Sequence, residues 1–212
     1  MTKATRSKIL QKCYEAICEH GFNTLRTDKE IQRLKITKGA FYHYFPSKFD
    51  LGYAVVDEVL MPMYLEKWSS LENISHGIAS ALYTIVEREK VNATEITVAR
   101  GDVLFNLMLE MSHEDELFRE KLEAVLEAQV KILQKAILAG KAVGEMKPNI
   151  DARSMAYGII GHLQGCYAVA KTRRSRDVFT LMVNTLQKEL KELLLSDALP
   201  MGTASRSAVS AV

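Results

Sequence analysis

The apolar residues of this chain recur at the three-and-four spacing of an α-helix, and nowhere do they alternate as they would in a strand. The pattern is clear at the start, where Ile9, Leu10, Cys13 and Ile17 precede Gly21, a residue suited to a left-handed helix end. Only four prolines interrupt 212 residues, and 48% of the chain is hydrophobic, which favours a folded helical protein over a disordered one. We therefore predict an all-α fold.

Capping patterns divide the first part of the chain. Thr27 followed by Glu30 has the spacing of a capping box, and Thr37 and Ser47 can each cap a further helix. Pro46 disfavours helical geometry in the residue before it, so the helix that Thr37 begins must be short. Two short helices packed under longer ones predict a helix-turn-helix. The expected helices are 5–20, 27–34, 37–44, 47 to about 68, 74–90, 96–111, 115–139, 151–172 and 176–195.

The stretch TKGAFYHYFPSK, residues 37–48, contains more large aromatic side chains than one helix face can bury. If Phe41 and Phe45 anchor this short helix one turn apart, Tyr42 and His43 are left facing outward. Tyrosine hydroxyls can donate to phosphate oxygens, and an imidazole can donate to or accept from a base edge. The pattern is typical of a helix that contacts a polyanion.

Two further features of this stretch agree with that interpretation. Gly39 and Ala40 keep the start of the helix slim enough to enter a groove about 12 Å wide. Lys48 lies in the first turn of the following helix, where a cation opposes the helix dipole unless an anion shares the site. A phosphate group bound by Lys48 and the free amides would remove that conflict.

The net charge of +2 is unevenly distributed. Residues 1–50 hold ten Lys and Arg against five Asp and Glu, whereas the remainder holds 18 against 21. A basic amino-terminal part on a mildly acidic body indicates a polyanionic partner for that part alone.

These residues resemble the amino-terminal domain of the TetR (tetracycline-repressor) family of bacterial transcription regulators. The resemblance rests on TDKEI at residues 27–31, on TKGAFYHYFPSK, and on Leu51 after it. It implies a ligand-responsive regulator, most often a repressor, that binds a palindromic operator in double-stranded DNA as a homodimer and is released by a small-molecule inducer. It implies base contacts by Lys38, Gly39, Ala40 and His43, and phosphate contacts by Thr27, Thr37, Tyr42, Tyr44 and Lys48. The turn departs from the family pattern, because Leu34-Lys35-Ile36-Thr37 lacks the usual glycine.

The resemblance also implies the domain organisation. Residues 1–46 are the expected helix-turn-helix DNA-binding domain, and 47–196 the helical ligand-binding and dimerisation bundle, with the helix from 47 shared as connector. Residues 197–212, rich in Ala and Ser, are the expected disordered tail. In a population shift, ligand binding would change the spacing of the two recognition helices, which must meet half-sites about one DNA turn apart or a multiple of it.

The region 151–195 is the expected dimer interface. Residues 151–172 are apolar nearly all round, and a helix buried on both sides in a chain of this size indicates a partner subunit. The expected contacts are Gly158, Gly161 and Gly165 on one helix and Phe179, Met182, Val183, Leu186 and Leu190 on the next.

An apolar or aromatic inducer is expected in the carboxy-terminal bundle. Large apolar side chains with polar tips suit such a cavity, although each of them also suits an ordinary core. The candidates are Met63, Tyr64, Trp68, Tyr83, Asp102, Phe105, Met108, Gln129, His162 and Tyr167. The segment RGDVLFNLMLEMS resembles an electrophile- and aldehyde-responsive branch of the family, but Asp102 stands where that branch often has cysteine.

Other functions find little support. Glu110 and His113 form one Glu-x-x-His motif, whereas a di-iron bundle needs two such motifs and two further glutamates, so neither a metal nor another cofactor is expected. No catalytic triad has supporting context, and we predict that the protein is not an enzyme. Without a signal peptide or a membrane-length apolar run, a cytoplasmic protein is expected. The alternative that remains is a helical small-molecule-binding protein whose basic part contacts a protein instead of DNA.

Overall fold

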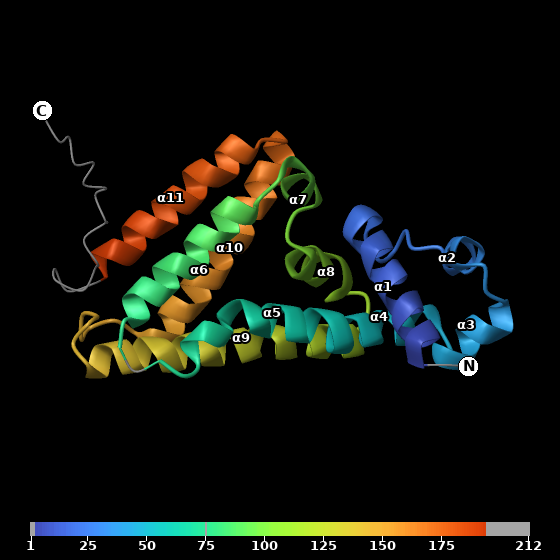
Figure 1. Ribbon diagram of the computed structural model, residues 1–212, viewed down its shortest axis with the longest axis horizontal. Helices are drawn as coiled ribbons and strands as arrows, with labels where there is room; N and C mark the ends of the chain where they lie inside the picture. The colour runs from blue at the N-terminus through green and yellow to red at the C-terminus, as the bar shows by residue number, and fades with distance from the viewer. Residues whose placement is uncertain (1–2, 75, 194–212) are drawn as a thin grey trace, which may run out of the picture.

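The computed structural model describes residues 3–74 and 76–193, which form helices joined by short turns and contain no β-strand (Figure 1). The predicted all-α fold is confirmed for this part of the chain, and the predicted tail 197–212 lies outside it. In chain order the helices are α1 (Lys3–His20), α2 (Thr27–Leu34), α3 (Lys38–Tyr44), α4 (Lys48–Val55), the π-helical turn η1 (Val56–Leu60), α5 (Met61–Trp68), the 3₁₀ turn η2 (Ser69–Leu71), α6 (Ile78–Asn92), α7 (Glu95–Arg100), α8 (Val103–Met111), α9 (Glu116–Ala142), α10 (Ala152–Arg173) and α11 (Arg176–Glu192).

Two of the three predicted caps form. The Thr37 hydroxyl accepts a hydrogen bond from the Ala40 N–H at 3.1 Å, and the Ser47 hydroxyl accepts one from the Asp50 N–H at 3.0 Å. The predicted capping box at Thr27 is wrong, because α2 begins at Thr27 itself and its cap residue, Arg26, makes no side-chain cap bond.

The turn between α2 and α3 works without a glycine. Lys35 takes the left-handed conformation with φ of 53°, and its N–H bonds the Gln32 carbonyl at 3.1 Å. Ile36 closes the turn with an N–H bond to the Ile31 carbonyl at 3.2 Å. The departure from the family pattern therefore leaves the helix-turn-helix path intact, since lysine adopts the backbone angle that glycine adopts more easily.

The helix predicted from 47 to 68 is continuous but contains one wide turn. The Met61 N–H bonds the Val56 carbonyl, five residues back, in η1. Pro62 follows directly, and a proline ring collides with the carbonyl four residues earlier in an ordinary α-helix. The wide turn accommodates that ring, as π-helical turns commonly do.

The helix predicted over 96–111 is instead two helices. Gly101 ends α7 with φ of 76°, and the Asp102 carboxylate then caps α8 by accepting from the Phe105 N–H at 2.8 Å. The sequence interpretation missed this break because apolar periodicity continues across it.

The buried residues form two clusters. The head cluster joins α1–α4, α8 and the first half of α9, with Ile9, Phe22, Phe41, Leu51, Val55, Leu104 and Phe118 among its members. The trunk cluster joins α6, α10, α11 and the second half of α9, with Trp68, Leu82, Leu133, Ile160, Phe179 and Val183 among its members. The helix that begins at Lys48 contributes to both clusters, as expected of a connector.

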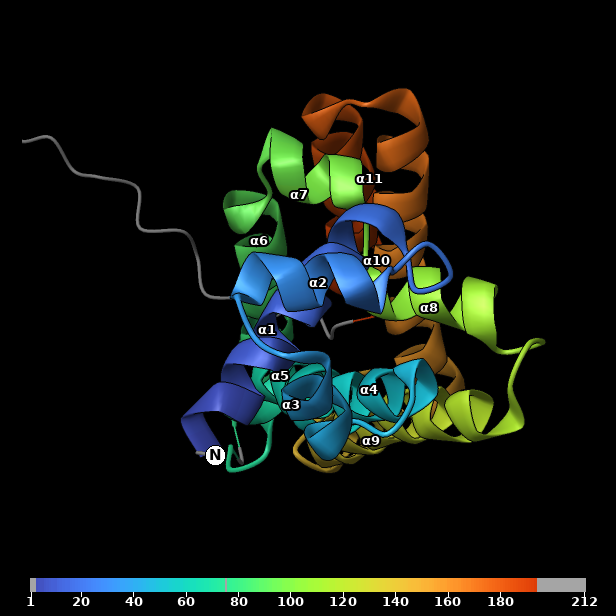
Figure 2. The same ribbon diagram turned by 90° about the vertical axis from the view of Figure 1, so that its right-hand side faces the viewer.

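The views show the same division. In Figure 1, α5 and α9 run side by side along the long axis, with α1–α3 at one end and α6, α10 and α11 at the other. Figure 2 shows α2 and α3 on the outer surface of the head end. Gly52 permits the close approach of α4 to α9, because a Cβ there would lie 2.5 Å from the Phe118 ring. Within the described residues, no helix is both long and apolar enough to span a membrane.

Candidate nucleic-acid interface and ligand cavity

Helix α3 presents its polar aromatic side outward, as the sequence predicts. Phe41 and Phe45 are 0% and 1% exposed in the head cluster, whereas Tyr42 is 42% exposed and His43 is also exposed. Gly39 faces open space, with no atom within 4 Å of an added Cβ. Ala40 is a correction to the predicted base contacts, because its side chain is buried and faces the core.

Three of the remaining predicted DNA contacts, Lys38, Tyr42 and Thr27, have polar partners on α2 and α3. Lys38 forms an ion pair with Asp28 at 2.8 Å, and this hydrogen bond raises the pKa of Lys38. The Tyr42 and Thr27 hydroxyls lie 3.5 Å apart. Thr37 is exposed and Tyr44 is half-buried, so α3 and the residues beside it form one accessible polar surface.

Lys48 departs from the expectation. Its ammonium donates to the Asn23 carbonyl at 2.9 Å and lies 4.8 Å from the centre of the Phe22 ring. Burial lowers the pKa of Lys48. The conflict between this cation and the helix dipole is thus relieved within the chain, and a phosphate is not required to explain the residue.

A cavity of about 570 Å³ lies where α1, α5, α6, α7 and α10 meet. Four of the ten predicted pocket residues line it: Met63, Tyr64, Asp102 and Tyr167. The remaining lining residues are Tyr14, Glu15, Cys18, Glu66, Lys67, Ile85, Arg88, Glu89, Asn92, Thr97, Arg100, Gly101 and Val103.

Six predicted pocket residues lie elsewhere, which corrects the expectation. Trp68 and Gln129 are buried core residues joined by an indole N–H to amide oxygen bond of 3.0 Å. The Lys191 ammonium covers the Tyr83 ring at 5.0 Å, and His162 lies 3.2 Å from Glu189. Phe105 and Met108 lie on α8 without lining the cavity.

The cavity wall is polar and tightly bonded around Asp102. Its second carboxylate oxygen accepts from the Tyr64 hydroxyl at 2.7 Å, and that hydroxyl accepts from the Leu104 N–H at 3.1 Å. Burial raises the pKa of Asp102, while the nearby Lys67 ammonium opposes that shift. Burial and the Asp102 charge raise the pKa of Tyr64 well above its usual value.

A second bonded group faces the same space. The Lys67 ammonium lies 3.2 Å from a Glu89 carboxylate oxygen, which also accepts from the Tyr167 hydroxyl at 3.2 Å. Both side chains of the ion pair are largely buried, with 20% and 18% exposed. Cys18 lines the cavity too, and burial raises the pKa of its thiol, which lowers its thiolate reactivity.

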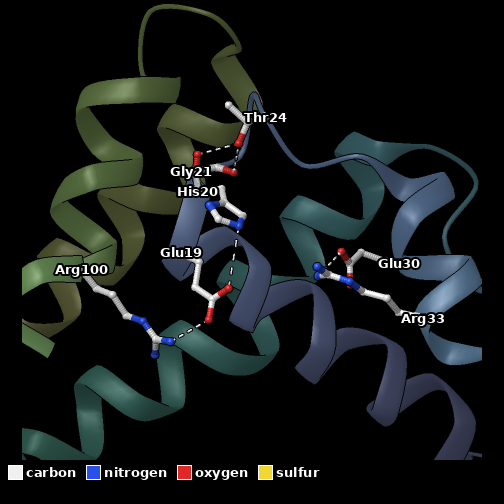
Figure 3. A network of polar contacts seen from close by, with 7 residues as sticks. All are labelled: Glu19, His20, Gly21, Thr24, Glu30, Arg33 and Arg100. Atoms are coloured by element: carbon white, nitrogen blue, oxygen red, sulfur yellow. Dashed lines mark hydrogen bonds and ion pairs between the residues drawn. The ribbon is translucent and has the colours of Figure 1, made fainter. Parts of the chain in front are cut away.

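Two contacts connect the cavity region to the head. Arg100 at the end of α7 pairs with Glu19 of α1 at 2.7 Å, and Glu19 also lies 3.8 Å from His20 (Figure 3). At the far end of α8, the Glu110 carboxylate accepts from the Phe22 N–H at 2.9 Å and the Asn23 N–H at 2.7 Å. The residue that caps the start of α8, Asp102, therefore lines the cavity. Near the other end of the helix, the Glu110 carboxylate accepts hydrogen bonds from the backbone of the head.

The bonds of Glu110 also account for the Glu-x-x-His motif formed by Glu110 and His113, which resembles half of a di-iron site. Its carboxylate is occupied by the turn after α1, and His113 lies near Glu114 at 3.1 Å. In the part of the chain that the structure describes, no group of three His, Cys, Asp or Glu residues could hold a metal ion.

The predicted dimer contacts divide into two groups. Gly158, Gly161 and Gly165 face open space on one side of α10. Phe179, Val183, Leu186 and Leu190 are buried in the trunk cluster and Met182 packs against it, so the predicted seam on α11 is wrong because those residues face inward. The same two helices also carry exposed apolar residues, Tyr157 and Val169 on α10 and Leu181 on α11, which are 38%, 43% and 66% exposed.

Comparison with known proteins identifies the class. Residues 9–55 match "Bacterial regulatory proteins, tetR family", and residues 80–186 match "Tetracyclin repressor-like, C-terminal domain". The chain belongs to the TetR family of bacterial transcription regulators. It is a ligand-responsive, DNA-binding transcriptional regulator, and the family is one of regulators, not enzymes.

Individual relatives are distant. The chain is 24% identical over 172 residues to the HTH-type transcriptional repressor DhaR of Mycobacterium sp. (strain GP1), covering 81% of this chain and 85% of that protein. It is 26% identical over 197 residues to an HTH-type transcriptional regulator of Lactococcus lactis, covering 87% and 94%. In fold it is similar to a TetR regulatory protein of Rhodobacter sphaeroides, with a TM-score of 0.76, 21% identity and coverage of 89% and 98%. It is also similar to reduced E. coli NemR, with a TM-score of 0.77, 18% identity and coverage of 92% and 100%.

Proposed function

We propose that the protein is a homodimeric repressor of a palindromic operator and that a small molecule in the 570 Å³ cavity releases it from DNA. The observation that carries this proposal is the position of α8 between the two sites. Asp102 at its start lines the cavity, and Glu110 near its end bonds the backbone of Phe22 and Asn23 in the head. The name of DhaR, a repressor, supports the direction of control.

Residues 1–46 serve as the DNA-binding domain and 47–196 as the ligand-binding and dimerisation domain. Lys38, Gly39 and His43 contact bases. Thr27, Thr37, Tyr42 and Tyr44 contact phosphates, and Lys48 joins them when its ammonium leaves the Asn23 carbonyl. The open side of α3 supports this assignment, since a helix needs an uncovered face to enter the major groove.

Dimerisation uses the open face of α10 and its neighbour on α11. The glycines at 158, 161 and 165 leave room for a second backbone, and Leu181 supplies exposed apolar area. Exposed apolar side chains together with an open glycine face favour a subunit interface. The two copies of α3 would then face one side of the dimer.

The ligand releases the protein from DNA through a population shift. A ligand that binds better when α8 is displaced favours heads whose α3 helices no longer match the two half-sites. Because Glu110 makes two charge-assisted bonds to the turn after α1, a shift of α8 has a direct path to the head.

The test is selection of bound fragments from random duplex DNA, followed by binding titrations at increasing salt. We expect a palindromic site and a steep fall in affinity with ionic strength, because several phosphates are neutralised. A protein that is monomeric and binds no duplex at low salt would contradict the proposal. If binding is instead to a protein partner, the affinity will depend only weakly on salt.

A further inference from the structure

The inner wall of the cavity has two carboxylates for one ammonium. Glu89 pairs with Lys67 at 3.2 Å, whereas Asp102 is bonded by neutral donors, the Tyr64 hydroxyl and the Phe105 N–H. Both acids lie in partly buried positions where water screens charge poorly. This wall is therefore net negative, and it favours a cation over an anion in the place that the Lys67 ammonium occupies.

Aromatic rings surround that excess of negative charge. Tyr14, Tyr64 and Tyr167 all line the cavity, and the Lys67 ammonium lies 5.2 Å from the centre of the Tyr64 ring. The face of an aromatic ring attracts a cation, more strongly where water is excluded. The site thus already holds an alkylammonium group, and that group is the chain's own Lys67.

The charged residues at the rim of the cavity do not cancel the negative charge of its inner wall. Arg100 is paired with Glu19 at 2.7 Å and Glu15 with Lys12 at 2.6 Å, and these side chains are all 42% exposed or more. Arg88 and Glu66 are exposed and of opposite sign. An anion inside the cavity would be repelled by the carboxylates of Glu89 and Asp102, and Lys67 would be its one cationic partner on the inner wall.

We propose that the cavity binds an organic cation, a protonated amine on an apolar body, whose ammonium takes the place of the Lys67 head against Glu89. The displaced lysine side chain turns toward the open side of the cavity, where its charge is hydrated. The cavity volume of about 570 Å³ suits an amine of drug-like size or smaller. This narrows the expected apolar or aromatic inducer to one that also carries a positive charge, and only its regulatory consequence rests on the proposed function.

The first experiment compares three probes of one shape by calorimetric titration of the full chain without DNA. They are 2-phenylethylamine, 2-phenylethanol and phenylacetate, which differ in the charge of the head group. We expect the amine to bind roughly tenfold or more tightly than the other two. Tighter or equal binding of phenylacetate, or no binding of the amine, would overturn the proposal.

Variants make the second experiment. Lys67→Met removes the internal competitor, so it should tighten amine binding by roughly tenfold. Glu89→Gln should weaken amine binding by about the same factor. Glu72→Gln, an exposed carboxylate that does not line the cavity, is the matched control and should change little. Weaker amine binding by Lys67→Met would exclude the displacement. If Glu89→Gln fails to fold, Asp102→Asn removes the second negative charge of the same wall and keeps a helix cap, so it should also weaken amine binding.

A third measurement separates this inference from the proposed function. Titration of the amine into the complex with selected operator DNA reports release independently of binding. Amine binding without release leaves the ligand class standing and contradicts the release mechanism. Release by another compound, with no amine bound to the free protein, refutes the ligand class and leaves the repressor function standing.

Discussion

The head and the cavity each contain a lysine–carboxylate pair, and the two pairs are built differently. Lys38 and Asp28 are 2.8 Å apart, with 70% and 63% of their side chains exposed. Lys67 and Glu89 are farther apart, at 3.2 Å, but only 20% and 18% exposed. Water screens the attraction between Lys38 and Asp28 and so lowers the free energy that this pair contributes. The pair with the shorter distance is therefore the weaker interaction.

The comparison teaches that burial, more than distance, decides which charged group is free to change partner. A DNA base edge can replace Asp28 beside Lys38 at small cost, because Lys38 and Asp28 are both already hydrated. Replacing a partner in the cavity requires a ligand of the right charge, since an unpaired buried charge is expensive. A surface that binds a uniform polymer and a cavity that discriminates among small molecules need these opposite arrangements.

The largest expected difference between the two regions is in stability. Asp102→Ala removes the cap of α8 and leaves the Tyr64 hydroxyl without its acceptor, which should lower the free energy of unfolding by about 2–3 kcal/mol. Asp28→Ala, the matched change on the exposed pair, should cost less than about 0.5 kcal/mol. Chemical denaturation measures both, and equal losses would refute the contrast between the regions.

The next effect concerns sequence preference in the head. His43→Ala should weaken binding to the selected operator by roughly 1–3 kcal/mol and relax the preference at one base position. Tyr42→Phe loses only a phosphate donor and should weaken binding to all sequences alike. Parallel titrations with operator and scrambled duplexes distinguish the two. An unchanged preference in His43→Ala would remove its base-reading role.

A smaller effect is expected where the two regions meet. Glu110→Gln keeps one acceptor for the turn after α1 but removes its charge, which should cost about 1 kcal/mol of stability. The same change should reduce the loss of operator affinity that ligand causes. Glu114→Gln, three residues after the end of α8 and largely exposed, is the control. A full ligand response in Glu110→Gln would show that α8 does not carry the signal.

The smallest effect is a pH dependence in the cavity. Burial raises the pKa of Asp102 above its ordinary value of 3.8. The folded state therefore holds a proton on this carboxyl group more tightly than the unfolded chain does. As pH rises from 3.8 through the raised value, the wild-type protein should lose stability relative to Asp102→Asn, since deprotonation favours the unfolded state. Denaturation of both proteins across that window tests the sign, and a gain by the wild type would contradict it.

The head was largely predictable from sequence because its signals are local. The caps at Thr37 and Ser47, the burial of Phe41 and the exposure of Tyr42 all follow from spacing within a few residues. The false capping box at Thr27 shows the limit, because a spacing of three residues does not say which residue begins the helix.

The cavity was only partly predictable because its walls come from distant parts of the chain. Tyr14 on α1 and Glu89 on α6 have no sequence signal that brings them together. Trp68 and Gln129 were misassigned because an amphipathic side chain satisfied by a buried partner looks the same in sequence as one that awaits a ligand. Gly101 followed by Asp102 is the signal that could have been used, since a glycine and a capping residue mark a helix break.

The wide turn at Val56–Leu60 sets the register of the side chains that follow it. It holds about one residue more than a regular turn and absorbs that residue within the turn, so the helix beyond it keeps its faces. Deleting one residue there would restore a regular α-helical turn and leave Tyr64 and Lys67 at the cavity. The same deletion within the regular turns of α5 would instead rotate the residues after it by about 100° away from the cavity. Insertions and deletions are therefore tolerated at this turn more readily than in the regular helix on either side of it.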